Sequence, residues 1–274
     1  MSTSITFIGG GNMATALIKG LVEKGRPSNE ISVVELKEEA RARLHETFGV
    51  QACGSVDELP PSQTRVVVWA VKPQVLHTAM RQAQALRSAL HVSIAAGIRA
   101  ASLCEWLGTQ RVVRAMPNTA AMVNRSVTGL YAASDAVSAD DRERIESLMT
   151  GIGEVFWVQS DESMDAVTAV SGSGPAYVFH FLEGLQAAAV SLGFDQAQAR
   201  RLALLTFQGA VQQALQTEDS FSLLRERVTS KGGTTAAALE VFNAHKTNEA
   251  TIAAVNAAFK RARELAHQLA AAET

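Results

Sequence analysis

The amino-acid sequence predicts an α/β domain with a doubly wound parallel sheet, followed by an all-α domain. Over the first 160 residues, short β-branched runs alternate with stretches of helical periodicity, which is the pattern of βαβ units. Beyond about residue 161 no run is typical of a strand, and alanine-rich helical segments follow one another. We therefore expect two domains, 1–160 and 161–274.

The strands and helices are expected from hydrophobic periodicity and from the residues that flank each run. The run 65-RVVVWAV-71 is apolar on both faces, as in a central strand covered on both sides. The other expected strands are 5–9, 30–36, 91–97, 111–116, 127–133 and 154–160. Expected helices include 12–25, 139–153, 175–193, 195–216 and 247–270. The stretch 171-SGSGPAYVF-179 predicts a Ser/Gly loop with Pro175 at the first helical position, acting as a hinge or as a closure over substrate.

Composition restricts the class of function. The 274 residues are 47% hydrophobic and 19% charged with a net charge of −2, so nothing indicates a nucleic-acid footprint. No apolar run approaches the about 20 residues of a membrane span. The N-terminal MSTSITFIGGG has no basic region typical of a signal peptide, and the two cysteines are expected to be reduced. We expect a cytoplasmic protein without nucleic-acid or membrane partners.

The stretch 5-ITFIGGGNMATALIKG-20 predicts a dinucleotide site. A strand runs into three glycines and a helix follows, which gives a G-x-G-x-x-A form of the Rossmann fingerprint. Gly9 would make the turn, Gly11 would admit the pyrophosphate, and Ala14 would pack helix against sheet. The alternative is a plain glycine-rich turn. The cofactor-binding residues expected here are Ile8, Gly9, Gly10, Gly11, Asn12 and Met13.

Glu35 is the candidate for the acidic residue that holds the ribose in this type of site. It ends the run 30-EISVVEL-36, at about the 20-residue distance that the fingerprint requires. A carboxylate there repels a 2′-phosphate and favours NADH over NADPH. However, Lys37, Arg41 and Arg43 follow closely and could turn toward a phosphate, or Glu35 could be merely solvated. We include Glu35 and Lys37 among the cofactor contacts.

Three further turns are expected at the same edge of the sheet, because ligands bind at the carboxyl ends of strands in doubly wound folds. The first is 70-AVKPQVL-76, the second is 95–97, and the third is 114-RAMPNTAAM-122. Lys72 is equally typical of a surface lysine, and Asn118 of a turn with an Asx hydrogen bond. The predicted cofactor contacts are Ala70, Val71, Lys72, Pro73, Ala95, Ala96, Gly97 and Asn118.

The stretch 228-VTSKGGTTAAALEVF-242 predicts an anion site. Adjacent glycines let the backbone turn with positive φ, and the helix that follows would present free N–H groups and the positive end of its dipole. The six histidines form no catalytic or metal-like constellation, so no metal is expected. Because no general base suited to alcohol oxidation stands out, hydride transfer to a protonated C=N bond is favoured.

In their order and spacing, FIGGGNMATALIKG, AVKPQ, IAAGI, MPNTA, SGSGPAYVF and VTSKGGTTAAALEVF make the chain similar to pyrroline-5-carboxylate reductases. The resemblance extends from residue 5 to about 265. It departs from the family at two positions, where Lys231 and Ala120 replace prolines that are common there. Lys231 adds a charge beside the anion site, which could tighten carboxylate binding or face solvent.

The resemblance implies reduction of a small cyclic imine, 1-pyrroline-5-carboxylate, to L-proline by NADPH or NADH, without a metal. It also implies a homodimer through the C-terminal helices, which could assemble into a higher ring. The substrate carboxylate would bind Gly232, Gly233, Thr234 and Thr235, with Ser230 assisting. Thr235 and Ser230 are the candidate catalytic residues, with the Thr235 hydroxyl near the ring nitrogen.

Two alternatives remain open at this point. A related imine or β-hydroxyacid reductase would use a lysine of the second domain as proton relay, and Lys231, Lys246 and Lys260 are the candidates past residue 160. A non-catalytic nucleotide-binding paralogue would keep the fold without the reaction. Loss of Gly232 or Gly233 would favour that paralogue, but both glycines are present.

Overall fold

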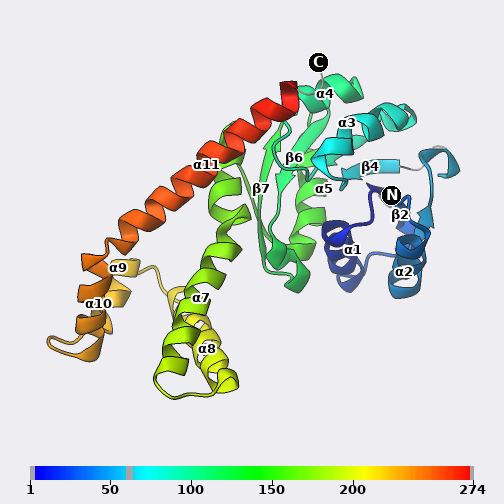
Figure 1. The fold of residues 1–274 in the computed structure, drawn as a ribbon. Coiled ribbons are helices and arrows are strands. Elements are labelled where there is room, and N and C mark those ends of the chain that lie inside the picture. The colour runs from blue at the N-terminus through cyan, green and yellow to red at the C-terminus, as the bar shows by residue number, and fades with distance from the viewer. Residues whose placement is uncertain (1–3, 60–63, 272–274) are drawn as a thin grey trace. The chain divides into compact units, whose positions relative to one another are not determined.

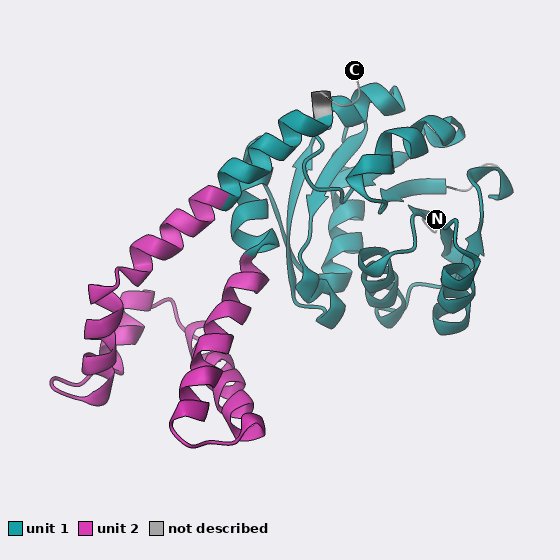
Figure 2. Ribbon diagram, in the orientation of Figure 1, with its two compact units in different colours: residues 1–173, 258–274 teal, residues 174–257 magenta. Residues whose placement is uncertain are grey.

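The computed structural model describes residues 4–59 and 64–271 (Figure 1). The chain forms two compact units, coloured separately in Figure 2: unit 1 is Met1–Ser173 with Ala258–Thr274, and unit 2 is Gly174–Ala257. The division into domains 1–160 and 161–274 stays a prediction. Residues 1–3, on which part of the expectation about a signal peptide rests, lie outside the described residues.

Unit 1 is built on one sheet of eight strands within the described part of the chain. The strands are β1 (Ser4–Ile8), β2 (Ile31–Val34), β3 (Gln51–Cys53), β4 (Thr64–Trp69), β5 (Leu90–Ser93), β6 (Val112–Met116), β7 (Ser126–Ala132) and β8 (Gly153–Trp157). Their order is β3-β2-β1-β4-β5-β6-β7-β8, and all neighbours are parallel except β6 and β7. The strand order reverses between β1 and β4, which creates the switch point of a doubly wound sheet. The predicted fold class is therefore confirmed.

Helices cover both faces of this sheet. One core lies between the strands and α1 (Asn12–Glu23), α2 (Glu38–Phe48) and α5 (Ala139–Met149). The other lies against α3 (Pro73–Gln82) and α4 (Ala100–Leu107), and the partly buried Leu269 near the end of α11 (Thr247–Ala271) packs against it. Figure 1 shows the α3 and α4 layer beside β4 and β6. Each face of the sheet thus buries its own set of apolar side chains.

Strand β4 explains why both faces must be covered. Val66 and Val68 point into the first core, while Val67 and Trp69 point into the second, because side chains alternate along a strand. Each of these four side chains is at most 2% exposed. Complete burial of a side chain of this size contributes about 1.5–3 kcal/mol. The expectation of a central strand at this position is confirmed.

Unit 2 is entirely helical within its described residues. It contains α7 (Gly174–Ser191), α8 (Gln196–Ala214), α9 (Phe221–Arg227), α10 (Thr234–Ala244) and the first part of α11. A capping box of Asp195 with Gln198 starts α8, and Ser220 caps α9. Ala199 and Ala203 are the buried hydrophobic residues among those described in this unit, whereas large side chains such as Phe221, 82% exposed, face outward. Unit 2 therefore buries little apolar surface by itself.

Several predicted elements differ from the structure. The Ser/Gly loop expected before Pro175 is wrong: α6 (Ser163–Val167) continues into a π-helix at Thr168–Gly172. Helix α7 begins at Gly174, next to the helix start expected at residue 175, which is confirmed. The strand expected to reach residue 97 ends at Ser93, because Ser93 Oγ accepts a hydrogen bond from the Ala95 N–H and Gly97 takes φ +78°. Strand β3 was not predicted at all, since three residues carry too little pattern.

None of the helices in the described ranges combines the length and the apolar character needed to cross a bilayer. Cys53 and Cys104 are buried free thiols. Burial raises the pKa of each thiol above its ordinary value.

A buried histidine is built into the centre of the sheet. His91 on β5 is 0% exposed, and its Nδ1 accepts a hydrogen bond of 3.2 Å from the Trp69 indole N–H. The two rings are stacked with centroids 5.9 Å apart. Burial lowers the pKa of His91 to about 4, because a charged imidazolium would lose its hydration there.

We predict that His91 makes the folded state sensitive to acid. Its pKa is depressed in the folded protein and about 6.5 in the unfolded chain, so the unfolded state alone takes up a proton as pH falls from 6.5 toward 4. The free energy of unfolding should fall by about 1.4 kcal/mol per pH unit at most from this group. Urea unfolding at pH 7.5, 5.5 and 4.5 measures it.

His91→Gln should remove this part of the pH dependence, and His45→Gln, which changes an exposed histidine, should retain it. An equal pH dependence in His91→Gln and in the unsubstituted protein would contradict the assignment.

Candidate active site

Three turns lie side by side at the carboxyl edge of the sheet. The turns 9–11, 70–73 and 94–97 follow β1, β4 and β5, which are adjacent in the sheet. Each turn starts with an N–H that donates to the next strand: Gly9 to Val34 O at 2.8 Å, Ala70 to Ile8 O at 2.8 Å, and Ile94 to Trp69 O at 3.2 Å. The predicted cofactor turns are thus brought together at the switch point.

The glycine turn has the features of a pyrophosphate site. Gly9 has φ +100°, and a Cβ there would lie 2.9 Å from Ala70 O, so only glycine fits. A Cβ on Gly11 would have nothing within 4 Å, which leaves the start of α1 open. Gly11 is the N-cap of α1 and no side chain caps the helix. The first N–H groups of α1 are therefore available to an anion, and Ala14 is fully buried beneath them, as expected.

Glu35 lies beside this turn with both carboxylate oxygens engaged. Its Oε2 accepts from the Gly10 N–H at 2.8 Å, and its Oε1 accepts from the Lys37 N–H at 3.0 Å. Arg41 donates to the backbone oxygens of Glu35 and Leu36, each at 2.8 Å. The carboxylate is thus fixed in place, and the Arg41 guanidinium is bound to the backbone.

A cavity of about 760 Å³ opens next to Glu35. Its size lies within the range of small-molecule sites, about 300–1,000 Å³. Apolar side chains form much of its wall, among them Ile8, Val34, Val71 and Val75. Glu35 and Asp57 are its charged lining residues within the described part of the chain. Such a cavity suits an uncharged aromatic group, and the two carboxylates make one part of its wall negatively charged.

The turn after β5 is fixed by its neighbours. Gly97 has φ +78°, and a Cβ there would lie 3.2 Å from Leu269 Cδ1 at the end of α11. Ala95 is buried, whereas Ala96 is exposed.

The turn after β4 leads directly into a helix. Lys72 is the exposed N-cap of α3 and Pro73 takes its first position, as expected.

Asn118 forms hydrogen bonds within unit 1. Its Nδ2 donates to Ser171 O at 3.1 Å and to Ser171 Oγ at 3.2 Å, and its Oδ1 accepts from the Ala120 N–H at 3.1 Å. The last contact is the Asx hydrogen bond named above as the alternative to a cofactor contact. Ser171, on the π-helix, was missed because the sequence indicated a loop there.

The turn predicted to bind an anion, residues 230–233, lies in unit 2 and is called the anion turn below. The Gly233 N–H donates to Ser230 O at 3.0 Å, and Gly232 has φ +71°, as in a type II turn. Helix α10 starts directly after it, with Gly233 as N-cap and no side-chain cap. The N–H groups of Thr234 and Thr235 are therefore free to meet an anion, while that of Gly233 closes the turn. Thr235 is half-buried and Ser230 is exposed.

The predicted site residues divide between the units. Those assigned to the cofactor, from Ile8 to Asn118, belong to unit 1, and those assigned to the substrate, from Ser230 to Thr235, belong to unit 2. No group of three or more His, Cys, Asp and Glu side chains suited to a metal occurs within the described residues. Asp57 was missed because it follows β3, the strand that the sequence did not reveal.

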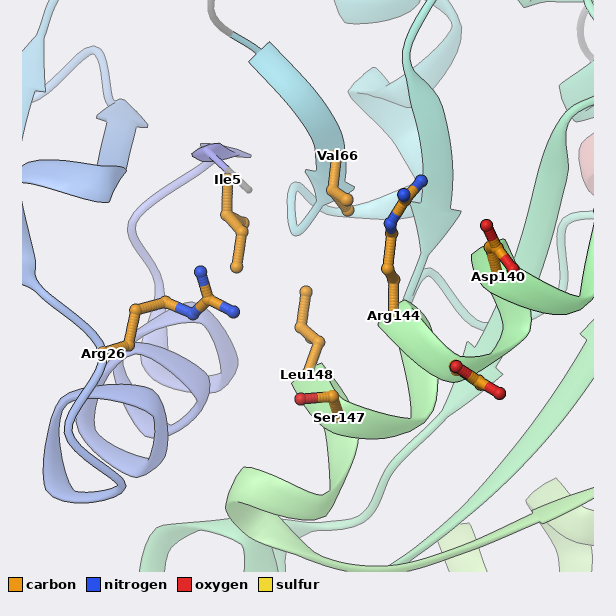
Figure 3. Close-up of a pocket in the computed structure, with 8 residues that line it drawn as sticks. Ile5, Arg26, Val66, Asp140, Arg144, Ser147 and Leu148 are labelled. Carbon is orange, nitrogen blue, oxygen red and sulfur yellow. The ribbon is translucent and has the colours of Figure 1, made fainter. Parts of the chain in front are cut away.

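A second cavity, of about 490 Å³, lies away from the carboxyl edge. Figure 3 shows Ile5 of β1 and Val66 of β4 above Leu148 and Ser147 of α5. Arg26 lies at the left of this view, and Arg144 and Asp140 of α5 lie at the right. These strand residues belong to the amino halves of β1 and β4, so this cavity contains none of the predicted cofactor residues.

Two family models match the chain. Residues 161–265 match the dimerisation domain of pyrroline-5-carboxylate reductase. Residues 4–97 match the model described as NADP oxidoreductase coenzyme F420-dependent. The first match covers α6 to most of α11, and the second covers the part of the sheet from β1 to β5 with its helices.

Similar proteins align along nearly the whole chain. A pyrroline-5-carboxylate reductase of Pseudomonas aeruginosa is 44% identical over 98% of this chain and 99% of its own. The solved structure of such a reductase from Coxiella burnetii has a TM-score of 0.91 at 38% identity, covering 97% of this chain and 99% of that one. The Plasmodium falciparum structure, with NADP bound, has a TM-score of 0.86 at 25% identity and covers 97% and 98%. With this extent of similarity, the chain belongs to the pyrroline-5-carboxylate reductase family.

Proposed function

We propose that the protein reduces 1-pyrroline-5-carboxylate to L-proline, the last step of proline biosynthesis, with hydride from a nicotinamide cofactor. The observation that carries this proposal is the 44% identity to a pyrroline-5-carboxylate reductase over 98% of the chain. The open helix starts at Gly11 and Gly233 support it, because each offers free N–H groups to an anion.

The nucleotide would bind along the carboxyl edge of the sheet. Its pyrophosphate would meet the N–H groups at the start of α1, and its adenosine would occupy the cavity beside Glu35. The turns 70–73 and 95–97 would then flank the nicotinamide, which supplies the hydride. The residues of these turns contribute chiefly orientation, because they present backbone groups and little side-chain bulk.

The substrate carboxylate would bind at the start of α10, where Thr234 and Thr235 present free N–H groups and the Ser230 hydroxyl lies on the adjoining turn. The helix dipole adds to this attraction. The Thr235 hydroxyl would orient the ring nitrogen or relay its proton. A threonine is not a strong acid, so the rate enhancement would come mainly from orientation and from the charge distribution of the site.

Thr235→Ala should lower kcat/KM for 1-pyrroline-5-carboxylate by about 10- to 1000-fold, or about 1.4–4 kcal/mol, because the hydroxyl is lost at the reacting nitrogen. Steady-state kinetics with saturating cofactor measures this change. Thr235→Ser should retain most of the activity. Thr234→Ala removes the neighbouring hydroxyl but keeps the backbone N–H proposed to meet the carboxylate, so it should change kcat/KM much less. Unchanged kinetics in a folded Thr235→Ala protein would remove Thr235 from the mechanism.

For the cofactor, we propose a preference for NADH over NADPH. The carboxylate of Glu35 is fixed by two backbone N–H groups, so it cannot turn away from a 2′-phosphate without losing them. Asp57 adds a second negative charge to the cavity wall. Arg41 would have to leave the backbone oxygens of Glu35 and Leu36 to bind a phosphate.

Glu35→Gln should raise the ratio of kcat/KM with NADPH to kcat/KM with NADH by about tenfold or more, which is about 1.4 kcal/mol. The substitution removes the charge and keeps an oxygen for the Gly10 N–H. Oxidation of NADH and NADPH, measured side by side with 1-pyrroline-5-carboxylate, gives the ratio. Glu38→Gln on the exposed start of α2 is the control. A strong NADPH preference in the unsubstituted protein would refute the proposal.

Lys231 occupies the second position of the anion turn, where proline is favoured because its φ is already set. Lys231→Pro should therefore stabilise the protein by about 0.4–1 kcal/mol, by reducing the freedom of the unfolded chain. Denaturant unfolding of Lys231→Pro and of Lys231→Gln separates this backbone effect from the loss of charge. Equal stability of the two variants would contradict the turn assignment.

We also propose a homodimer formed through unit 2, with further assembly into a ring of dimers as an extension. The exposed apolar side chains of unit 2 support a second copy as the covering partner, as does the match to a dimerisation domain. Light scattering measures the molar mass of the assembly directly.

For localisation, we propose the cytoplasm, because the two free cysteines agree with a reducing compartment.

A further inference from the structure

A group of ion pairs lies directly after the turn 95–97. Arg99 follows the turn, and its Nη2 donates to Asp165 Oδ2 at 2.7 Å. Its Nη1 donates to the backbone oxygen of Asp161 at 3.2 Å. Asp165, on α6, is 2% exposed, so this pair is largely removed from water. Charge-assisted bonds of this kind are the strong ones, and they fix the direction of a planar guanidinium.

Asp161 ties the same segment to two further elements. Its Oδ2 accepts from the Ala100 N–H at 3.0 Å, at the start of α4. Its Oδ1 pairs with Arg114 of β6, a residue that is 4% exposed. The N-cap residue of α4 is Arg99, which makes no side-chain cap of its own. The start of α4 is therefore capped by a side chain from the 161–165 segment rather than by its own flanking residue.

The opposite end of the turn is fixed independently. The Ile94 N–H donates to Trp69 O, and the Ala95 N–H donates to Ser93 Oγ. Between these bonds and Arg99 lie Ala96, Gly97 and Ile98, and the positive φ of Gly97 is a conformation that few other residues adopt. The path of the turn is thus set at one end by the sheet and at the other by the 161–165 segment.

We propose that Arg99 is a positioning residue for cofactor binding: through Asp165 and Asp161 it holds the turn 95–97 where its backbone meets the nicotinamide end of the dinucleotide. This inference rests on the proposed function. The groups of a binding site have to be held within about 0.5 Å by supporting contacts, so the turn needs support of this kind. The family match for dimerisation begins at residue 161, so the same ion pair joins the cofactor turn to the first residues of that region.

The test compares two arginine–aspartate pairs of the same unit. Arg111 binds Asp141 through Nε at 2.7 Å and Nη2 at 2.6 Å, and Asp141 is 1% exposed. Arg111 precedes β6 and Asp141 is on α5, so this pair does not touch the turn 95–97. The variants Arg99→Met and Arg111→Met each remove the guanidinium and keep an unbranched apolar chain.

The measurements are Kd for NADH and for NADPH by titration of cofactor fluorescence, KM and kcat with 1-pyrroline-5-carboxylate, and Tm. Both methionine variants should lose stability. Only Arg99→Met should raise Kd and KM for the preferred cofactor, by about tenfold or more, with kcat at saturating cofactor changed much less. Arg99→Lys, which restores one charge–charge contact, should recover part of the affinity. If Arg99→Met does not fold, the cofactor Kd and KM are measured on Arg99→Lys and Asp165→Glu instead.

An unchanged cofactor Kd in a folded Arg99 variant would overturn the proposal, as would an equal rise in Arg111→Met, which would show a general loosening of unit 1. These outcomes are separate from the proposed function. An unsubstituted protein that binds NADH but reduces no 1-pyrroline-5-carboxylate would refute the reaction, and an Arg99-dependent Kd would still support the positioning role.

Discussion

The hydrogen-bond ladder at the switch point of the sheet is the constraint on which the cofactor side of the structure depends. Gly9, Ala70 and Ile94 each donate a backbone N–H to the neighbouring strand, so three separate turns leave the sheet next to one another at its carboxyl edge. Backbone bonds set this arrangement, so side chains on the turns can be small. Gly11 then leaves room for a ligand to approach the backbone of the first turn. Parallel pairing of β2, β1, β4 and β5 keeps the three turns next to one another.

Two fixed charges flank this backbone site. Glu35 is bound to the N–H groups of Gly10 and Lys37, and Arg99 is bound to Asp165 and Asp161. Both are charged groups whose positions are set by partners, one beside the ribose end of the predicted site and one beside its nicotinamide end. Groups fixed in this way need no reorganisation, whether they face a ligand directly or hold a neighbouring turn in place.

Unit 2 follows a different physical rule. Its helices are capped and regular, yet large apolar side chains such as Phe221 and Leu205 are exposed, and the buried hydrophobic residues among those described there are two alanines. Local propensity and capping are enough to form the helices, but they do not supply a core. Burial of these side chains requires a partner surface, which fits the match of this region to a dimerisation domain.

The sequence by itself determined the fold class, the glycine turn before α1 and the anion turn before α10, because these rest on local features: strand periodicity, adjacent glycines and helix starts. Only the tertiary structure decided that Asn118 bonds to Ser171, that Glu35 is fixed by Gly10, and that Asp161 caps α4. It also replaced the predicted Ser/Gly loop before Pro175 with a π-helix. These contacts join residues far apart in the chain, and the spacing of residue types carries no record of which distant partner each will meet.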